Sequence, residues 1–139
     1  MKYFAIVGYV GLTFNSMVVH GEMCRLQENV EMGQSMRCTA AARSAGPSDF
    51  YFSPGKLNKG HHFLCHFTSS PVSATLLPER SHFPEGVTFT PSRPDYRFPQ
   101  QLTIDATNMT QSSADVKFAY EVSPSDMPAE IEAFCQQAD

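Results

Sequence analysis

The chain has 139 residues, of which 42% are hydrophobic and 17% charged, which is enough for one domain with its own core. Fourteen acidic residues against ten basic ones give a net charge of −4. This balance excludes the basic footprint of proteins that are held on nucleic acid by phosphate neutralisation. No sequence motif indicates a cofactor.

Residues 1–21 have the pattern of a secretory signal peptide. Lys2 gives a short positive start, an apolar run follows, and Val19 and Gly21 supply the small residues expected before a cleavage site. The run is too short and too interrupted for a membrane span. Cleavage would leave residues 22–139 as one secreted domain with a net charge of −5, because Lys2 is lost.

The predicted mature domain contains four cysteines: Cys24, Cys38, Cys65 and Cys135. An even number in a small secreted domain predicts two disulfide bonds, and four cysteines allow three pairings. None of the short paired spacings of a structural zinc site is present, so no metal is predicted.

Residues 28–45 are predicted to form a helix. Met32, Met36 and Ala40 are spaced four apart and would form a modest apolar stripe. The Gly-Pro pair at 46–47 would end the helix.

Residues 47–74 contain a predicted strand at 62–67, with Phe63, Cys65 and Phe67 on one face. The segment 47–74 is either a recognition surface or a neutral surface insertion. The loops at 47–59 and 108–113 are the candidate contact surfaces.

His61, His62 and His66 flank Cys65, so one alternative is a metal site or a catalytic role for these histidines. Ordinary strand histidines are favoured, because His62 and His66 would lie on the face opposite Cys65. His82 is expected in a solvated turn.

The segment 77–121 carries three further predicted strands. The first covers 87–90, the second is marked by Leu102 and Ile104, and the third covers 114–121. In the third, apolar residues alternate with polar ones, as in a half-buried antiparallel strand.

Asn108-Met109-Thr110 is a glycosylation sequon, which has meaning if the loop at 108–113 is exposed during secretion. The tail at 123–139 is expected to hold a turn and a short apolar patch that leads to Cys135.

The segment 77–121 resembles the sheet of the fungal guanyl-specific ribonucleases. The family pattern of turn residues, aromatics and prolines is matched in order by Pro78, Glu85, Gly86, Phe89, Ser92, Pro94, Tyr96, Phe98 and Pro99. After one inserted residue, Ala114, Asp115 and Phe118 also match. The resemblance extends to the ribonuclease-like secreted effectors of powdery mildews and related plant-pathogenic fungi.

The resemblance implies an α+β fold, in which a single helix packs on a twisted antiparallel sheet. It also implies that Cys24 pairs with Cys135, which leaves Cys38 to pair with Cys65. Relative to the family, residues 47–74 would be an extra insertion of loop and strand.

The catalytic residues of the family are not retained. The positions of its tyrosine, histidine, base glutamate and arginine hold Leu77, Glu79, Arg97 and Val116, and no histidine follows His82. Leucine and valine cannot hold phosphate, and arginine cannot act as a base near neutral pH. We therefore predict no catalytic residue and no enzymatic activity.

A candidate ligand-binding cleft is expected where the family site would lie, formed by Glu79, Arg80, Tyr96 and Arg97. Arg97 could attract a phosphate or a carboxylate there. Alternatively, it forms an ion pair with Glu79 that fills an inactive cleft.

The function predicted from the resemblance is that of a secreted, catalytically inactive ribonuclease-like effector, a virulence or avirulence factor. It would act in a host, outside or inside host cells, by binding a host protein such as an immune receptor or its target, or RNA without cleavage. It would be a monomer with no membrane partner.

Two alternatives remain open. One is an active ribonuclease with Glu79 as base and His61, His62 or His82 as acid. The other is a secreted, disulfide-bonded binding protein unrelated to ribonucleases.

Overall fold

The computed structural model describes residues 24, 31–41 and 51–139. The predicted signal peptide lies outside them. The described residues form ten strands and one 3₁₀ turn: β1 (Met36–Ala40), β2 (Tyr51–Phe52), β3 (Lys56–Asn58), β4 (His62–Ser70), β5 (Ala74–Leu76), η3 (Pro78–Arg80), β6 (Thr88–Pro91), β7 (Gln100–Asp105), β8 (Ser113–Asp115), β9 (Phe118–Val122) and β10 (Ala129–Gln137).

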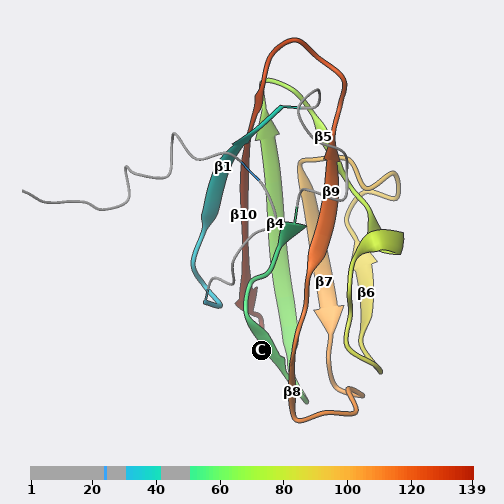
Figure 1. The fold of residues 1–139 in the computed structure, drawn as a ribbon. Coiled ribbons are helices and arrows are strands. Elements are labelled where there is room, and N and C mark those ends of the chain that lie inside the picture. Colours follow the sequence, from blue (N-terminus) through green and yellow to red (C-terminus); the bar gives the residue numbers. More distant parts are fainter. Residues whose placement is uncertain (1–23, 25–30, 42–50) are drawn as a thin grey trace, which may run out of the picture.

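The strands form two layers that face each other (Figure 1). The larger sheet has five strands in the order β1-β10-β4-β7-β6, all antiparallel, and the smaller has the order β2-β9-β5. The pair β3-β8 continues the ladder of β2 and β9 past an interruption, where the Ser53 hydroxyl donates to the Val116 carbonyl at 3.0 Å. The fold is therefore a small β-sandwich.

Aromatic side chains fill the space between the layers. Phe67 on β4 contacts Phe118 on β9 at a centroid distance of 5.2 Å, Phe98 at 5.5 Å and Phe52 on β2 at 6.4 Å. All four rings are buried. Burial of several such rings is the main stabilising term in a domain of this size.

The predicted strand at 62–67 is confirmed as the first part of β4, with Phe63, Cys65 and Phe67 buried. The strands expected at 87–90 and around Leu102 and Ile104 are confirmed as β6 and β7. The single strand expected at 114–121 is confirmed only in part, because the structure divides it into β8 and β9. The segment 47–74, expected as an insertion, supplies β2, β3 and the central strand of the larger sheet.

The predicted α+β fold with a helix at 28–45 is wrong. In the part of this segment that the structure describes, residues 36–40 form an edge strand that pairs with β10. Met36, Cys38 and Ala40 point into the core, so the apolar spacing is two rather than four. Gly33 has a φ of +91°, which suits a turn before the strand. The only helical element of the described residues is the 3₁₀ turn η3.

The two predicted disulfides are confirmed, but the pairing implied by the resemblance is wrong. Cys65 and Cys135 face each other on neighbouring strands β4 and β10, with their Cα atoms 4.0 Å apart. Cys24 pairs with Cys38 on β1 and so ties the preceding segment to the edge of the larger sheet.

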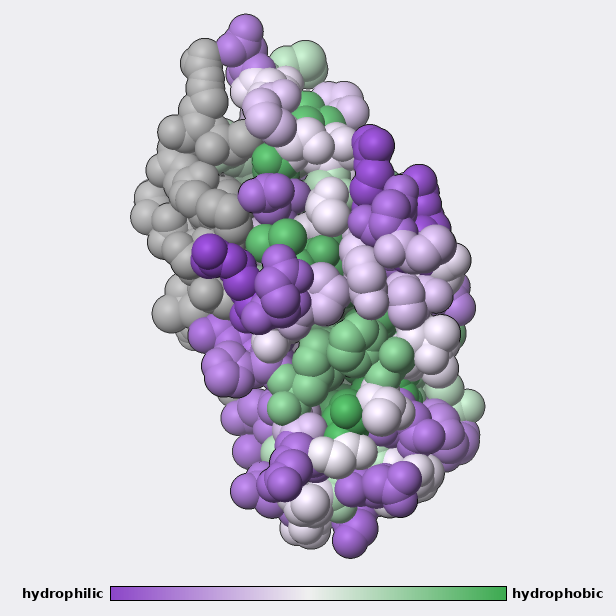
Figure 2. Space-filling model, turned by 90° about the vertical axis from the view of Figure 1, so that its right-hand side faces the viewer, coloured by the Kyte–Doolittle hydropathy of each residue, from purple (hydrophilic) through white to green (hydrophobic). Residues whose placement is uncertain are grey.

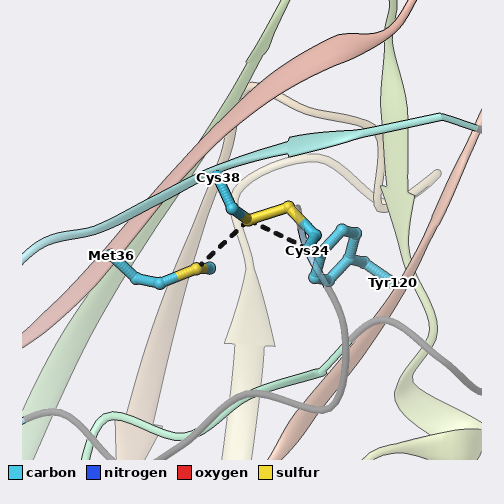
Figure 3. The surroundings of a disulfide bond; sticks show 4 residues. All are labelled: Cys24, Met36, Cys38 and Tyr120. Atoms are coloured by element: carbon cyan, nitrogen blue, oxygen red, sulfur yellow. Dashed lines mark hydrogen bonds between the residues drawn. A yellow bond between two sulfur atoms is a disulfide. The ribbon is translucent and has the colours of Figure 1, made fainter. Parts of the chain in front are cut away.

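The Cys24–Cys38 bond lies beside Met36 and Tyr120 (Figure 3), and all four side chains are buried. The Sγ atom of Cys38 lies 3.4 Å from the sulfur of Met36 and 3.7 Å from the Tyr120 hydroxyl of the opposite layer. Burial raises the pKa of Tyr120 above its ordinary value. We assign this cluster a structural role.

Candidate binding surface

The outer face of the five-stranded sheet carries the exposed and half-buried residues of its strands. Along β4 and β10 the buried residues alternate with residues that are exposed or half-buried, as a sheet with one wet face requires. Because β1, β10, β4, β7 and β6 lie side by side, these outward residues form one continuous face.

The first hollow on this face lies across β1, β10 and β4 and has a volume of about 140 Å³. Its polar lining consists of Arg37, Thr39, Thr68, Ser70, Glu130 and Glu132. Arg37 donates to one carboxylate oxygen of Glu132 through Nε at 3.2 Å and Nη2 at 3.1 Å. Both side chains are exposed, so this pair adds little stability and mainly positions charge at the rim. No ion pair joins Glu130 to another residue of the described ranges.

The second hollow adjoins the first, because Thr68 lines both. It has a volume of about 200 Å³ and is also lined by His66, Phe67, Ser92, Pro99, Gln100 and Gln101. His66 stacks on Phe134 of β10, with ring centroids 4.9 Å apart and planes 20° apart. A half-buried aromatic pair beside polar hollows gives this face both apolar and polar contact groups.

The buried side chain of Gln100 holds the loop at one end of the second hollow. Its Oε1 atom accepts from the Ser92 amide at 2.8 Å, the Ser92 hydroxyl at 3.0 Å and the Arg93 amide at 3.2 Å, and its Nε2 donates to the Arg93 carbonyl at 3.1 Å. These four bonds from one buried amide tie Ser92 and Arg93, at the start of the loop, to Gln100 at its end.

The tip of this loop is strained. Tyr96 has a φ of +62°, a conformation that non-glycine residues rarely adopt. The Asp95 carboxylate accepts from the Arg97 amide at 3.1 Å and lies 3.7 Å from Arg93 Nε. Strained residues that the surroundings hold in place occur often at binding sites.

The four residues of the predicted cleft do not line either hollow. Glu79 and Arg80 are exposed on η3, after β5. Tyr96 and Arg97 run beside β5, where the Leu76 amide donates to the Tyr96 carbonyl at 2.8 Å. Instead of the expected pair with Glu79, Arg97 Nη2 donates to the Ser73 hydroxyl at 3.2 Å.

His61 and His62 lie at the start of β4 and contact carboxylates. His62 Nδ1 is 3.1 Å from Asp139, His62 Nε2 is 3.6 Å from Asp105, and His61 Nδ1 is 3.4 Å from Asp139. Hydrogen bonds from the Thr107 hydroxyl and amide lower the pKa of Asp105. The amide and ring of His62 lower that of Asp139.

This arrangement differs from a metal site, because both ring nitrogens of His62 are turned toward carboxylates. In the described residues, no group of three or more His, Cys, Asp or Glu side chains is arranged to hold a metal ion. No hydrogen bond or ion pair joins Glu79 to a histidine within the same ranges, and His82 pairs through its backbone with Lys117.

Sequence reasoning missed the residues that build the outer face, above all Glu130, Glu132 and Thr68. The signal in the sequence was the alternation of Glu130 and Glu132 with buried Ile131 and Ala133. Of the loops expected to carry recognition, 47–50 lies outside the described residues, and 51–59 supplies β2 and β3 to the sandwich.

No helix in the described ranges has the length and apolar character that crossing a membrane requires. Comparisons with protein-family models, with curated proteins and with solved structures find no match to this chain. The functional assignment therefore depends on the surface itself.

Proposed function

We propose that the chain is a secreted, disulfide-stabilised binding protein that engages a protein partner through the outer face of its five-stranded sheet. The observation that carries this proposal is the pair of adjoining hollows that meet at Thr68 on an otherwise uncovered sheet face. Among the functions predicted from the sequence, this one corresponds to the secreted, disulfide-bonded binding protein unrelated to ribonucleases.

Two observations support the secreted part of the proposal. Both disulfides are buried between or beside strands, and bonds of this kind persist in oxidising compartments. The sequence before Cys24 has the pattern of a signal peptide, and secretion through it remains a prediction.

The charge of the face favours a protein with a basic surface over RNA. Glu130 and Glu132 border the first hollow, Asp105 ends β7 on the same face, and Arg37 is paired with Glu132. RNA binding relies on unpaired cations that neutralise phosphates. An acidic face instead attracts lysine and arginine side chains and speeds the approach of a basic partner.

The binding function does not depend on the resemblance to ribonucleases. The effector role in a host does depend on it, and the fold that the resemblance implied is wrong. That role stays a prediction.

The test is a photo-crosslinking experiment with a matched pair of sites. A photoreactive residue replaces Thr68, at the junction of the hollows, or Glu121, an exposed residue of β9 on the opposite sheet. Each protein is incubated with the extracellular proteins of its source tissue and irradiated. We expect one discrete adduct at position 68 and none at 121. Equal labelling at both positions would contradict the proposal.

Charge-reversal variants then test whether binding depends on this face or only on the net negative charge of the protein. Glu130→Lys and Glu121→Lys change the net charge by the same amount on opposite faces. We expect Glu130→Lys to weaken capture of the identified partner about tenfold or more, as for a charge inside an interface, and Glu121→Lys to change it little. Equal effects would show a non-specific charge interaction. A parallel titration with RNA that saturates would move the assignment to nucleic acid.

A further inference from the structure

An apolar area lies at the open side of the sandwich, next to the edge strand β6. Phe83 stacks on Phe89 of β6 with centroids 4.4 Å apart and planes 13° apart, and it meets Phe118 of the core edge-on at 5.7 Å. Phe83, Val87 and Phe89 are half-buried at the rim of the core, and we call them the rim patch. The side of the molecule that carries β6 shows an apolar area surrounded by polar atoms (Figure 2).

Two copies of the chain could associate through this edge strand and the rim patch beside it. β6 pairs with β7 on one side only and is the last strand of its sheet. Edge strands and neighbouring apolar patches are places where a second chain can add, and secreted proteins commonly cover them.

The turn that follows β7 packs directly against the loop that carries the rim patch. The Thr110 amide donates to the Glu85 carbonyl at 3.1 Å. A Cβ atom on Gly86 would lie 2.1 Å from the Asn108 carbonyl oxygen, so only glycine permits this approach. Asn108 therefore sits next to the segment that connects Phe83 to Phe89.

The same turn presents a glycosylation sequon to solvent. Met109 is 1% exposed and anchors the turn in the core, whereas Asn108 and Thr110 on either side of it are exposed. Asp105 holds the turn by accepting from the Thr107 amide and hydroxyl. Among the described residues, the Asn108 carboxamide makes no hydrogen bond that would restrain it.

We propose that Asn108 carries an N-linked glycan and that its first sugar lies over the rim patch. In the transfer, the amide nitrogen of Asn108 forms a bond with C1 of the sugar. The bond from C1 to the pyrophosphate of a lipid-linked oligosaccharide donor breaks, the lipid pyrophosphate leaves, and the amide gives up one proton. The C–H face of the sugar ring then packs on the aromatic rings, and its hydroxyls face water.

The first experiment asks whether the site is used. The full chain is secreted from a eukaryotic host and weighed by intact mass spectrometry before and after digestion with peptide N-glycosidase. We expect one glycan on the native chain and on Thr110→Ser, which keeps the sequon. We expect none on Asn108→Gln or Thr110→Ala. A native chain without a glycan at Asn108 would overturn the proposal.

The second experiment asks whether the glycan covers the rim patch. Enzymatic removal of the glycan from folded protein should raise the fluorescence of an apolar dye severalfold and shift sedimentation toward dimers. Val87→Thr, a mild change within the patch, should reduce both effects.

The control relocates the glycan. Ser125→Asn with Met127→Thr creates a sequon in the exposed turn between β9 and β10, in a chain that also carries Asn108→Gln. This glycan lies far from the rim patch, so dye binding should stay high. If a glycan at 125 suppresses dye binding as well as one at 108, the covering role is wrong.

Discussion

The outer faces of the two sheets differ in how they are covered. On the smaller sheet, Ala119 points outward from β9 between Phe118 and Tyr120, yet all three are buried, and η3 packs against this strand. On the larger sheet, the outward residues of β4 and β10 reach solvent and surround two hollows. The smaller sheet therefore contributes buried residues on both faces of β9, whereas the larger sheet leaves its outer face open to solvent. That open face is the one proposed above for binding.

The largest expected effect is the difference in stability lost when a ring is removed from the inner face or from the outer face of the larger sheet. Phe67→Ala removes a buried ring that contacts three others and should lower the free energy of unfolding by about 3–5 kcal/mol. Phe134→Ala removes a half-buried ring on the outer face that stacks on His66, and should cost about 1 kcal/mol. Urea denaturation measures both. Similar losses would mean that the outer face is needed for folding.

The two disulfides should also contribute unequally to stability, with the larger contribution from the bond at the centre of the larger sheet. Cys65–Cys135 closes 70 residues in the middle of the larger sheet, and Cys24–Cys38 closes 14 at its edge. Loop-closure entropy predicts losses of about 4 and about 3 kcal/mol when each pair is replaced by alanine. Thermal unfolding of the two double variants under oxidising conditions tests this order. A larger loss from the Cys24–Cys38 pair would show that the edge, rather than the centre, limits stability.

A third pair of variants tests the coverage of the two outer faces directly. Ala119→Leu adds volume to a fully buried position and should cost about 1–3 kcal/mol through overpacking. Thr68→Leu adds volume on the open face and should change stability by about 0.5 kcal/mol or less. Chemical denaturation again gives both values. A tolerated leucine at 119 would show that the smaller sheet also has an accessible outer face.

The smallest effect concerns the end of the open face, where Thr107 holds Asp105. Thr107→Val removes the hydroxyl that contributes most to the lowered pKa of Asp105, so that pKa should rise toward the ordinary value of about 3.9. Because the pKa of Asp105 is lower in the folded chain than in the unfolded chain, its contribution to stability is present above the unfolded value. It is lost as the pH falls through the folded value. Carboxyl-carbon NMR titration measures the shift, with Thr103→Val on the same strand as the control. An unchanged pKa in Thr107→Val would contradict the assigned cause.

Local patterns predicted the strands whose apolar residues are large. Phe63, Cys65 and Phe67 marked β4, and Leu102 and Ile104 marked β7, because bulky residues at a spacing of two suit a half-buried strand. The strand β10 was missed because it begins with two alanines and two glutamates among its first five residues, and both residue types are depleted in strands.

The helix prediction failed for a related reason. Alanine and methionine favour helices, and a spacing of four is also twice the spacing of a strand. Because Cys38, between Met36 and Ala40, is also buried, the spacing of buried residues is that of a strand. The position of Cys38 depends on its bond to Cys24 and on pairing with β10, which lies far away in the sequence.

The match to the ribonuclease pattern involved mostly turn residues, and these have local explanations in the sandwich. Gly86 has a φ of +89° and lets Asn108 approach, and Pro99 follows a cis peptide bond. Glycine and proline are common at such turns in many β folds, so they carry little information about one fold. The hollows could not be predicted, because β1, β4 and β10 come together only through pairing between distant segments.

The bond between Cys65 and Cys135 also has a consequence for how the sequence can change. A shift of one residue between β4 and β10 would exchange every inward side chain with an outward one. The disulfide joins residues that are directly opposite, and it therefore fixes the alignment of the two central strands. Because the disulfide secures this alignment, side chains on the outer face can be replaced without shifting the register of the two central strands. On the proposed binding face, substitutions can therefore suit a new partner while the alignment of the strands is kept.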